Sequence, residues 1–163
     1  MNSGNSDAPI FRTVLLSARG ENGGGDSFSV EVPAQSLGQA YRASQKLEEV
    51  RIDGVRYYDF GSTGIFGRVV LDPDSGRVME VGKDRTGATL VNSTIEKFSE
   101  CVQGFIGRFP FYSADEEDRW EVVAREVEEM IQGIDPAAFF EGGYWYEIRW
   151  AVAIGDFATE ELE

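Results

Sequence analysis

Residues that could support nucleophilic or metal chemistry are scarce in this chain. Histidine is absent from the 163 residues, and cysteine occurs once, at Cys101. Serine and cysteine nucleophiles therefore lack the general base that usually activates them near neutral pH. A zinc site needs several cysteine or histidine ligands, so the sequence predicts no metal site. We interpret Cys101 as a structural thiol, partly buried at the edge of an apolar stripe on a helix.

Two glycine-rich segments and one aspartate pair have the outline of ligand-binding loops without their defining residues. Residues 20–26 lack the Lys-Ser/Thr pair of a phosphate-binding P-loop, and residues 61–67 are spaced GxxGxxG rather than GxGxxG. Asp72 and Asp74 begin like a calcium loop, but the third oxygen ligand, the sixth-position glycine and the terminal glutamate are missing. All three are interpreted as turns, and we predict no cofactor.

Carboxylate pairs, as in glycosidases, remain as the one kind of catalytic equipment in the sequence. Among 29 acidic residues some pair lies close by chance, so this pattern carries little information. A carboxylate-dependent hydrolase stays open beside a protein without catalysis.

The acidic charge is concentrated in the second half of the chain. The formal net charge is −14, of which residues 92–163 carry −12. Such a field repels nucleic acid and anionic lipid, and it attracts basic partners. No stretch approaches the 18 apolar residues of a membrane span, and Met1–Pro9 has no basic segment followed by an apolar run. With one cysteine and no secretory signal, we expect a cytoplasmic setting.

Elements with a period of two dominate the first half. Residues 1–9 are predicted to be a disordered leader, and residues 10–163 a single domain. Ile10–Leu16 fits a strand or a helix, Arg19–Asp26 is expected to be a mobile loop, Ser27–Val32 alternates like a strand, and Gln35–Glu49 is compatible with a short helix. An antiparallel meander is predicted from Val50–Phe60, Ile65–Leu71 and Arg77–Val81, with a tight hairpin at Asp72–Gly76.

The period changes to about 3.6 at Asn92. Ser93 and Glu96 form a capping-box pattern, which predicts a helix starting at Asn92 or Ser93 and running to Gly107. Its apolar stripe consists of Ile95, Phe98, Val102, Phe105 and Ile106. A second helix is predicted over Asp115–Gln132, with Trp120, Val123, Val127, Met130 and Ile131 on its inner face, and a short helix at Asp135-Pro136. Tyr144–Ile154 fits a strand or a helix equally well.

Several short motifs occur in an order that resembles a known family. Residues 67–78 (GRVVLDPDSGRV) are followed by residues 91–98 (VNSTIEKF), and later by Asp135–Phe139 and Tyr144-Trp145. This order resembles the fourth group of the SUKH superfamily of bacterial immunity proteins. The resemblance covers roughly residues 27–155 and implies a helix for Tyr144–Ile154. Members are non-enzymatic proteins, typically encoded beside toxins that they bind and block, often nucleases or nucleic-acid deaminases.

These observations combine into one expectation: an α+β domain of SUKH type, in which an antiparallel sheet is covered by C-terminal helices, neutralising a basic protein toxin. A non-toxin adaptor on the same fold is the alternative. The expected partner surface is an acidic ridge on the second helix with Arg125 as the only basic neighbour, and the alternative is a patch of exposed aromatics on the sheet. The predicted contact residues are Asp118, Glu121, Glu128 and Glu129 on the ridge and Tyr57, Tyr58 and Asp59 on the sheet.

Overall fold

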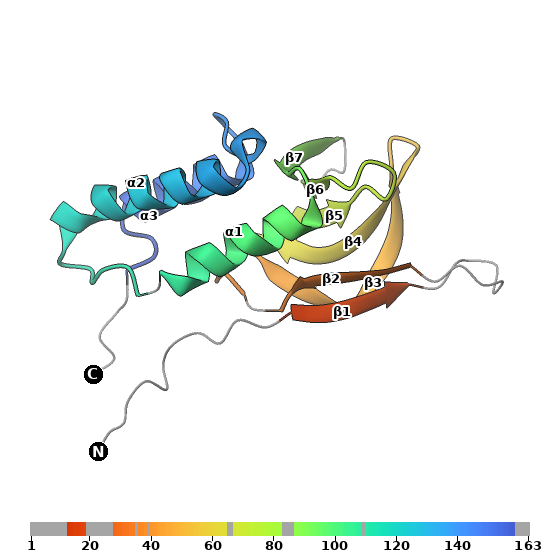
Figure 1. Cartoon of the computed structure of the whole chain (residues 1–163), viewed down its shortest axis with the longest axis horizontal. Coiled ribbons are helices and arrows are strands. Elements are labelled where there is room, and N and C mark those ends of the chain that lie inside the picture. The colour runs from red at the N-terminus through yellow and green to blue at the C-terminus, as the bar shows by residue number, and fades with distance from the viewer. Residues whose placement is uncertain are drawn as a thin grey trace, which may run out of the picture.

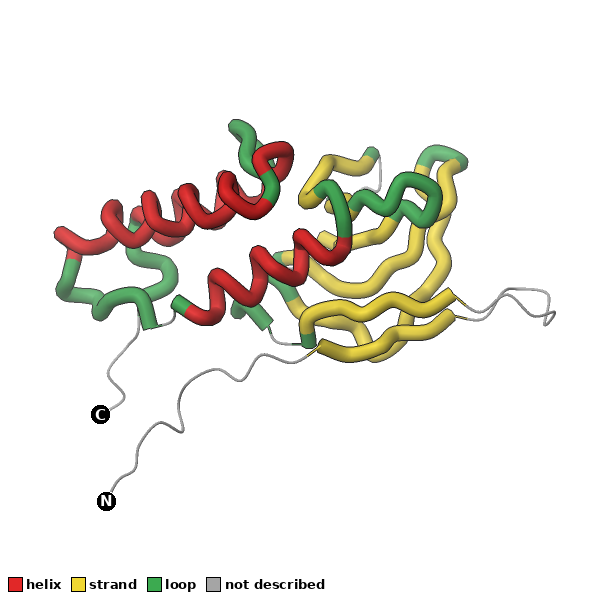
Figure 2. Tube along the Cα trace, in the orientation of Figure 1, coloured by secondary structure: helices red, strands yellow, loops and turns green. Residues whose placement is uncertain are grey.

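The chain forms a mixed α+β structure with strands on one side and helices on the other (Figure 2). The computed structural model describes residues 13–18, 28–34, 36–38, 40–64, 67–82, 87–108 and 110–158. The predicted leader at 1–9 and loop at 19–26 lie outside these ranges. The strands are β1 (Thr13–Ala18), β2 (Phe28–Pro33), β3 (Arg42–Ile52), β4 (Val55–Thr63), β5 (Gly67–Leu71), β6 (Val78–Val81) and β7 (Ala88–Asn92). The helices are α1 (Ile95–Gly107), α2 (Glu117–Ile134), the 3-10 turn η1 (Pro136–Ala138) and α3 (Tyr144–Ala153).

Strands β3 to β7 form a five-stranded antiparallel meander, and β1 and β2 form a separate antiparallel pair that contacts β3 (Figure 1). The meander and its β5–β6 hairpin are confirmed. In that hairpin the Gly76 N–H donates to the Asp72 carbonyl at 2.8 Å, and Gly76 has φ +79°, which glycine adopts without strain. The segment Ile10–Leu16, left open between strand and helix, contributes to strand β1 from Thr13 onward.

The short helix considered for Gln35–Glu49 is wrong, because Arg42–Ile52 is a strand paired with β4. Helix-favouring residues such as Lys46 and Glu48 are overruled by cross-strand pairing and by burial of Leu47 and Ile52. The β3–β4 hairpin is closed by Asp53-Gly54, whose φ values are 53° and 81°. This dipeptide is the one local sign in the sequence that a hairpin forms here.

An aromatic core joins the sheet to the helices. Phe98 of α1 contacts Tyr41 and Phe60 edge-on, with ring centroids 5.2 and 5.7 Å apart. Trp145 of α3 lies against Phe98 and Phe105, and its exposed fraction is 0%. Four of the five residues of the predicted α1 stripe are buried and Ile95 is half-buried, and Cys101, placed at the edge of that stripe by the sequence, is fully buried.

Helices α2 and α3 run side by side next to α1 (Figure 1). Helix α2 buries Val123, Ala124, Val127 and Ile131. The helix implied for Tyr144–Ile154 is confirmed by α3, which packs beside the acidic helix α2. This arrangement positions the surfaces described next.

Candidate partner-binding surfaces

The predicted acidic ridge on α2 divides into two parts. Asp118 and Glu129 are exposed, as expected from the helical wheel. Glu121 is exposed as well and Glu128 is half-buried, but both pair with Arg149 of α3. The expectation that Arg125 is the only basic neighbour of this ridge is therefore wrong.

Arg149 is the buried cation of this surface, with a side chain only 7% exposed. Its Nη1 and Nη2 atoms donate to the two carboxylate oxygens of Glu121 at 3.0 and 2.6 Å, and Nε donates to Glu128 at 2.9 Å. Glu121 and Glu128 lie about two helical turns apart on the same side of α2, and together they hold the Arg149 guanidinium in a fixed orientation. The hydrogen bond from Arg149 lowers the pKa of Glu121, and the same bond raises the pKa of Arg149. The carboxylate and the guanidinium therefore both stay charged at physiological pH.

Sequence reasoning missed the outer stripe of α3, which consists of Tyr146, Trp150 and the C-cap residue Ile154. Trp150 is 45% exposed and Ile154 is 63% exposed. The Arg149 guanidinium lies over the Trp150 ring at 4.5 Å, and Tyr146 contacts the same ring edge-on at 6.1 Å. The spacing of four residues was a readable signal once the segment was assigned to a helix.

The predicted sheet patch is not exposed, so that expectation is wrong. Tyr57, Tyr58 and Asp59 have exposed fractions of 9%, 8% and 6%. Alternation along β4 sends Tyr58 into the main core, where it stacks on Phe28 at 4.5 Å, while Tyr57 joins a smaller apolar cluster on the other face of the sheet. Both faces of β4 are covered, which single-strand periodicity does not reveal.

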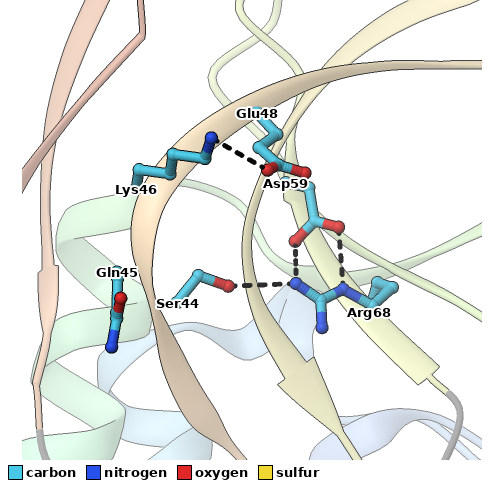
Figure 3. A pocket seen from close by; sticks show the side chains of 6 residues that line it. All are labelled: Ser44, Gln45, Lys46, Glu48, Asp59 and Arg68. Carbon is cyan, nitrogen blue, oxygen red and sulfur yellow. Dashed lines mark hydrogen bonds and ion pairs between the residues drawn. The ribbon is translucent and has the colours of Figure 1, made fainter.

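Asp59 lines a hollow of about 530 Å³ over strands β3 to β5 (Figure 3). Arg68 binds its carboxylate through Nε at 2.7 Å and Nη2 at 2.8 Å, and Nη2 also donates to Ser44. At the rim, Lys46 pairs with Glu48 at 3.6 Å. The charged side chains of the hollow therefore neutralise each other in pairs. We interpret the Asp59–Arg68 pair as a brace at the bulge between Asp59 and Gly61.

The motif residues Asn92, Ser93, Asp135 and Trp145 meet in one buried network. Asp135, 1% exposed, accepts from the Asn92 amide at 3.0 Å, the Ser93 N–H at 2.7 Å and the Ser93 hydroxyl at 2.8 Å. The Trp145 indole N–H donates to Oδ1 of the Asn92 side chain at 2.8 Å. The network ties the end of β7 to η1 and α3, which explains why these residue types occur together.

The predicted capping box at Ser93 and Glu96 is wrong by one residue. Thr94 caps α1 by accepting from the Lys97 N–H at 3.1 Å, and the helix begins at Ile95. Ser93 is unavailable as a cap because its hydroxyl is bonded to Asp135.

Asp135 gives the network a pH dependence of defined sign. Burial acts to raise the pKa of its carboxyl, but the hydrogen bonds from Ser93 and Asn92 outweigh burial and hold the pKa below its ordinary value. The folded state therefore binds this proton more weakly than the unfolded state. The stabilisation is complete above the unfolded pKa of about 4 and is lost as pH falls through the lower folded value.

We expect the melting temperature of the wild type to fall more between about pH 5 and about pH 2 than that of Asp135→Asn, which cannot titrate there. Thermal unfolding at matched ionic strength measures the difference. Equal falls in the two proteins would show that Asp135 does not contribute this term.

Three further observations concern the thiol, metal binding and membrane-spanning helices in the described residues. Burial raises the pKa of the Cys101 thiol to about 12, so the thiol stays protonated at neutral pH. Within the described ranges, no cluster of three or more acidic or cysteine side chains is arranged to hold a metal ion, and no helix there is long and apolar enough to cross a bilayer.

Comparison with known proteins places the chain in a family. The family model described as SUKH-4 immunity protein matches residues 32–151, which span β2 to α3 and include the whole buried network. No curated protein and no solved structure matches. The hairpin at Asp72–Gly76, the Asn92–Asp135 network and all but the last two residues of α3 fall inside the matched region, and this chain belongs to the SUKH-4 immunity protein family.

Proposed function

We propose that this chain is a non-enzymatic, cytoplasmic immunity protein that binds and neutralises a cognate bacterial toxin as a single domain over residues 10–163. Membership of the SUKH-4 immunity protein family is the observation that carries the proposal. The scarcity of catalytic groups supports it, because histidine is absent and the single cysteine is buried and protonated.

The partner we propose is a basic protein toxin, a nuclease or a nucleic-acid deaminase. Residues 92–163 carry a net charge of −12, and the acidic side chains of α2, including Asp118 and Glu129, lie at the surface. A toxin that acts on nucleic acid needs a basic groove, and an acidic surface complements that groove and speeds association with it. The same charge disfavours direct binding to nucleic acid and to anionic membranes.

An adaptor or regulatory module on the same fold is the alternative. It is favoured by one observation, namely that the motif residues Asn92, Asp135 and Trp145 are buried and hold the fold together rather than contact a partner. A large toxin-bearing reading frame beside the gene supports the immunity function, whereas a regulatory or cell-wall gene supports the adaptor.

The test uses the purified toxin domain encoded beside this chain. We expect an equimolar amount of the wild type to abolish its activity, with no turnover by the chain itself. Asp118→Lys/Glu129→Lys is expected to associate roughly tenfold more slowly at low salt and at nearly the wild-type rate at high salt, because salt screens the steering. Both residues are exposed, so the free energy of unfolding should change by no more than about 0.5 kcal/mol for each.

The matched control reverses two exposed acids on the sheet side, Glu31→Lys/Asp74→Lys, with the same change in net charge. A smaller loss of rate in this control would assign the steering to α2 rather than to net charge. Undiminished toxin activity in the presence of excess wild type would overturn the proposed function, as would turnover that depends on one carboxylate of the chain.

A further inference from the structure

The outer stripe of α3 leaves apolar side chains uncovered by the described part of the chain. Trp150 and Ile154 are 45% and 63% exposed, and Tyr146 lies one turn before Trp150 on the same side of the helix. Single exposed apolar residues are ordinary on protein surfaces. Two exposed residues beside the half-buried Tyr146 on one stripe, with two of the three aromatic, have the composition of an interface core.

The stripe is also held rigidly before any partner arrives. Glu121 and Glu128 fix the Arg149 guanidinium, which lies 4.5 Å from the Trp150 ring. Tyr146 also contacts Trp150, with ring centroids 6.1 Å apart, and is itself packed on Phe139 at 5.7 Å. A ring that is ordered in the free protein loses little entropy on binding, which is a property of binding hot spots.

The charge beside the stripe selects the kind of partner. Arg149 carries one positive charge against the two negative charges of Glu121 and Glu128, and Glu147 adds another exposed carboxylate on α3. The surface is therefore apolar at its centre and negative at its edge. A second copy of this chain, with a net charge of −14, would bring like charges together here.

We infer that the outer stripe of α3, flanked by Glu121 and Glu128, is the surface that docks the basic toxin, with Trp150 and Ile154 entering an apolar depression and the glutamates facing arginine or lysine side chains. This inference rests on the proposed function and deepens it by naming the docking surface. It moves the centre of the contact from the middle of α2 to the junction of α2 and α3.

Two variants test the stripe against the purified toxin domain encoded beside the chain. Ile154→Lys places a positive charge against a basic partner, and Trp150→Ser removes the rigid ring. We expect each variant to raise the dissociation constant at least about tenfold, as measured by calorimetry. Ile154 is mostly exposed, so its variant stays folded even if Trp150→Ser is destabilised, and thermal unfolding checks both.

The matched control is Leu15→Lys, because Leu15 is an aliphatic residue of β1 that is 64% exposed and outside both the stripe and α2. We expect its dissociation constant to stay within about threefold of the wild type. Hydrogen exchange of the wild-type complex should show protection over residues 144–154.

The possible failures are distinguishable. Tight binding by the wild type and by Ile154→Lys alike, without protection of α3, would overturn the docking surface and leave the proposed function standing. No binding by the wild type would overturn the proposed function and this inference with it. A wild-type dimer that Ile154→Lys dissociates would identify a second copy as the occupant and contradict the inference.

Discussion

Replacing Asp135 with alanine is expected to lower the free energy of unfolding by about 3 to 5 kcal/mol. The carboxylate is 1% exposed and accepts three hydrogen bonds from Asn92 and Ser93. Its loss leaves three donors without a partner in a buried site, and each such donor costs about 1 to 3 kcal/mol, with partial relief from rearrangement. Since small domains are stable by about 5 to 15 kcal/mol, the variant should be close to unfolding at physiological temperature.

Urea unfolding followed by tryptophan fluorescence measures this loss, and the Trp145 ring, bonded to Asn92, reports on the network directly. The matched control is Asp118→Ala, an exposed aspartate that should change the free energy of unfolding by no more than about 0.5 kcal/mol. A loss below about 1 kcal/mol for Asp135→Ala would contradict the role we give to the buried network.

Removing both glutamates that hold Arg149 is expected to cost more than removing Arg149 itself. Glu121→Ala/Glu128→Ala leaves a guanidinium whose side chain is 7% exposed without its carboxylates, and an uncompensated buried charge costs about 3 kcal/mol or more. Arg149→Met fills the same space with an apolar side chain. The two glutamates that remain are 49% and 31% exposed and are solvated by water, so the expected loss is about 1 kcal/mol.

The order of the two losses is the measurement, by urea unfolding at neutral pH. Arg125→Met serves as control, because Arg125 is 66% exposed and its pair with Glu121 is long, at 3.8 Å. If Arg149→Met proved the more destabilising of the two changes, Arg149 would act mainly through the packing of its apolar stem, and the pairing account would fail.

Much of the fold could be predicted from local pattern and from the family resemblance. The meander, the Asp72–Gly76 hairpin and the buried stripe of α1 follow from periods of two and 3.6 and from turn residues. Strand β3 could not be predicted from its helix-favouring residues, because its conformation depends on pairing with β4. Thr94 was missed as the cap because the Ser93 hydroxyl bonds to Asp135, more than forty residues later in the chain.

The candidate surface was predictable only in part. The wheel for α2 placed Asp118 and Glu129 outward correctly, since helix periodicity decides which side chains face solvent. The role of Arg149 depends on α3 lying beside α2, which is a tertiary fact that no local pattern contains. The burial of Tyr57 depends in the same way on a second apolar cluster on the far face of the sheet.

The most direct test of the central claim is survival of cells that express the proposed cognate toxin domain. We predict that co-expression of the wild type restores growth, and that Ile154→Lys restores it poorly although the variant is folded and present at the same level. Leu15→Lys, with its substitution on the exposed side of β1, should protect like the wild type. Cells killed equally with and without the wild-type chain, at equal expression, would contradict the account that this protein neutralises a toxin.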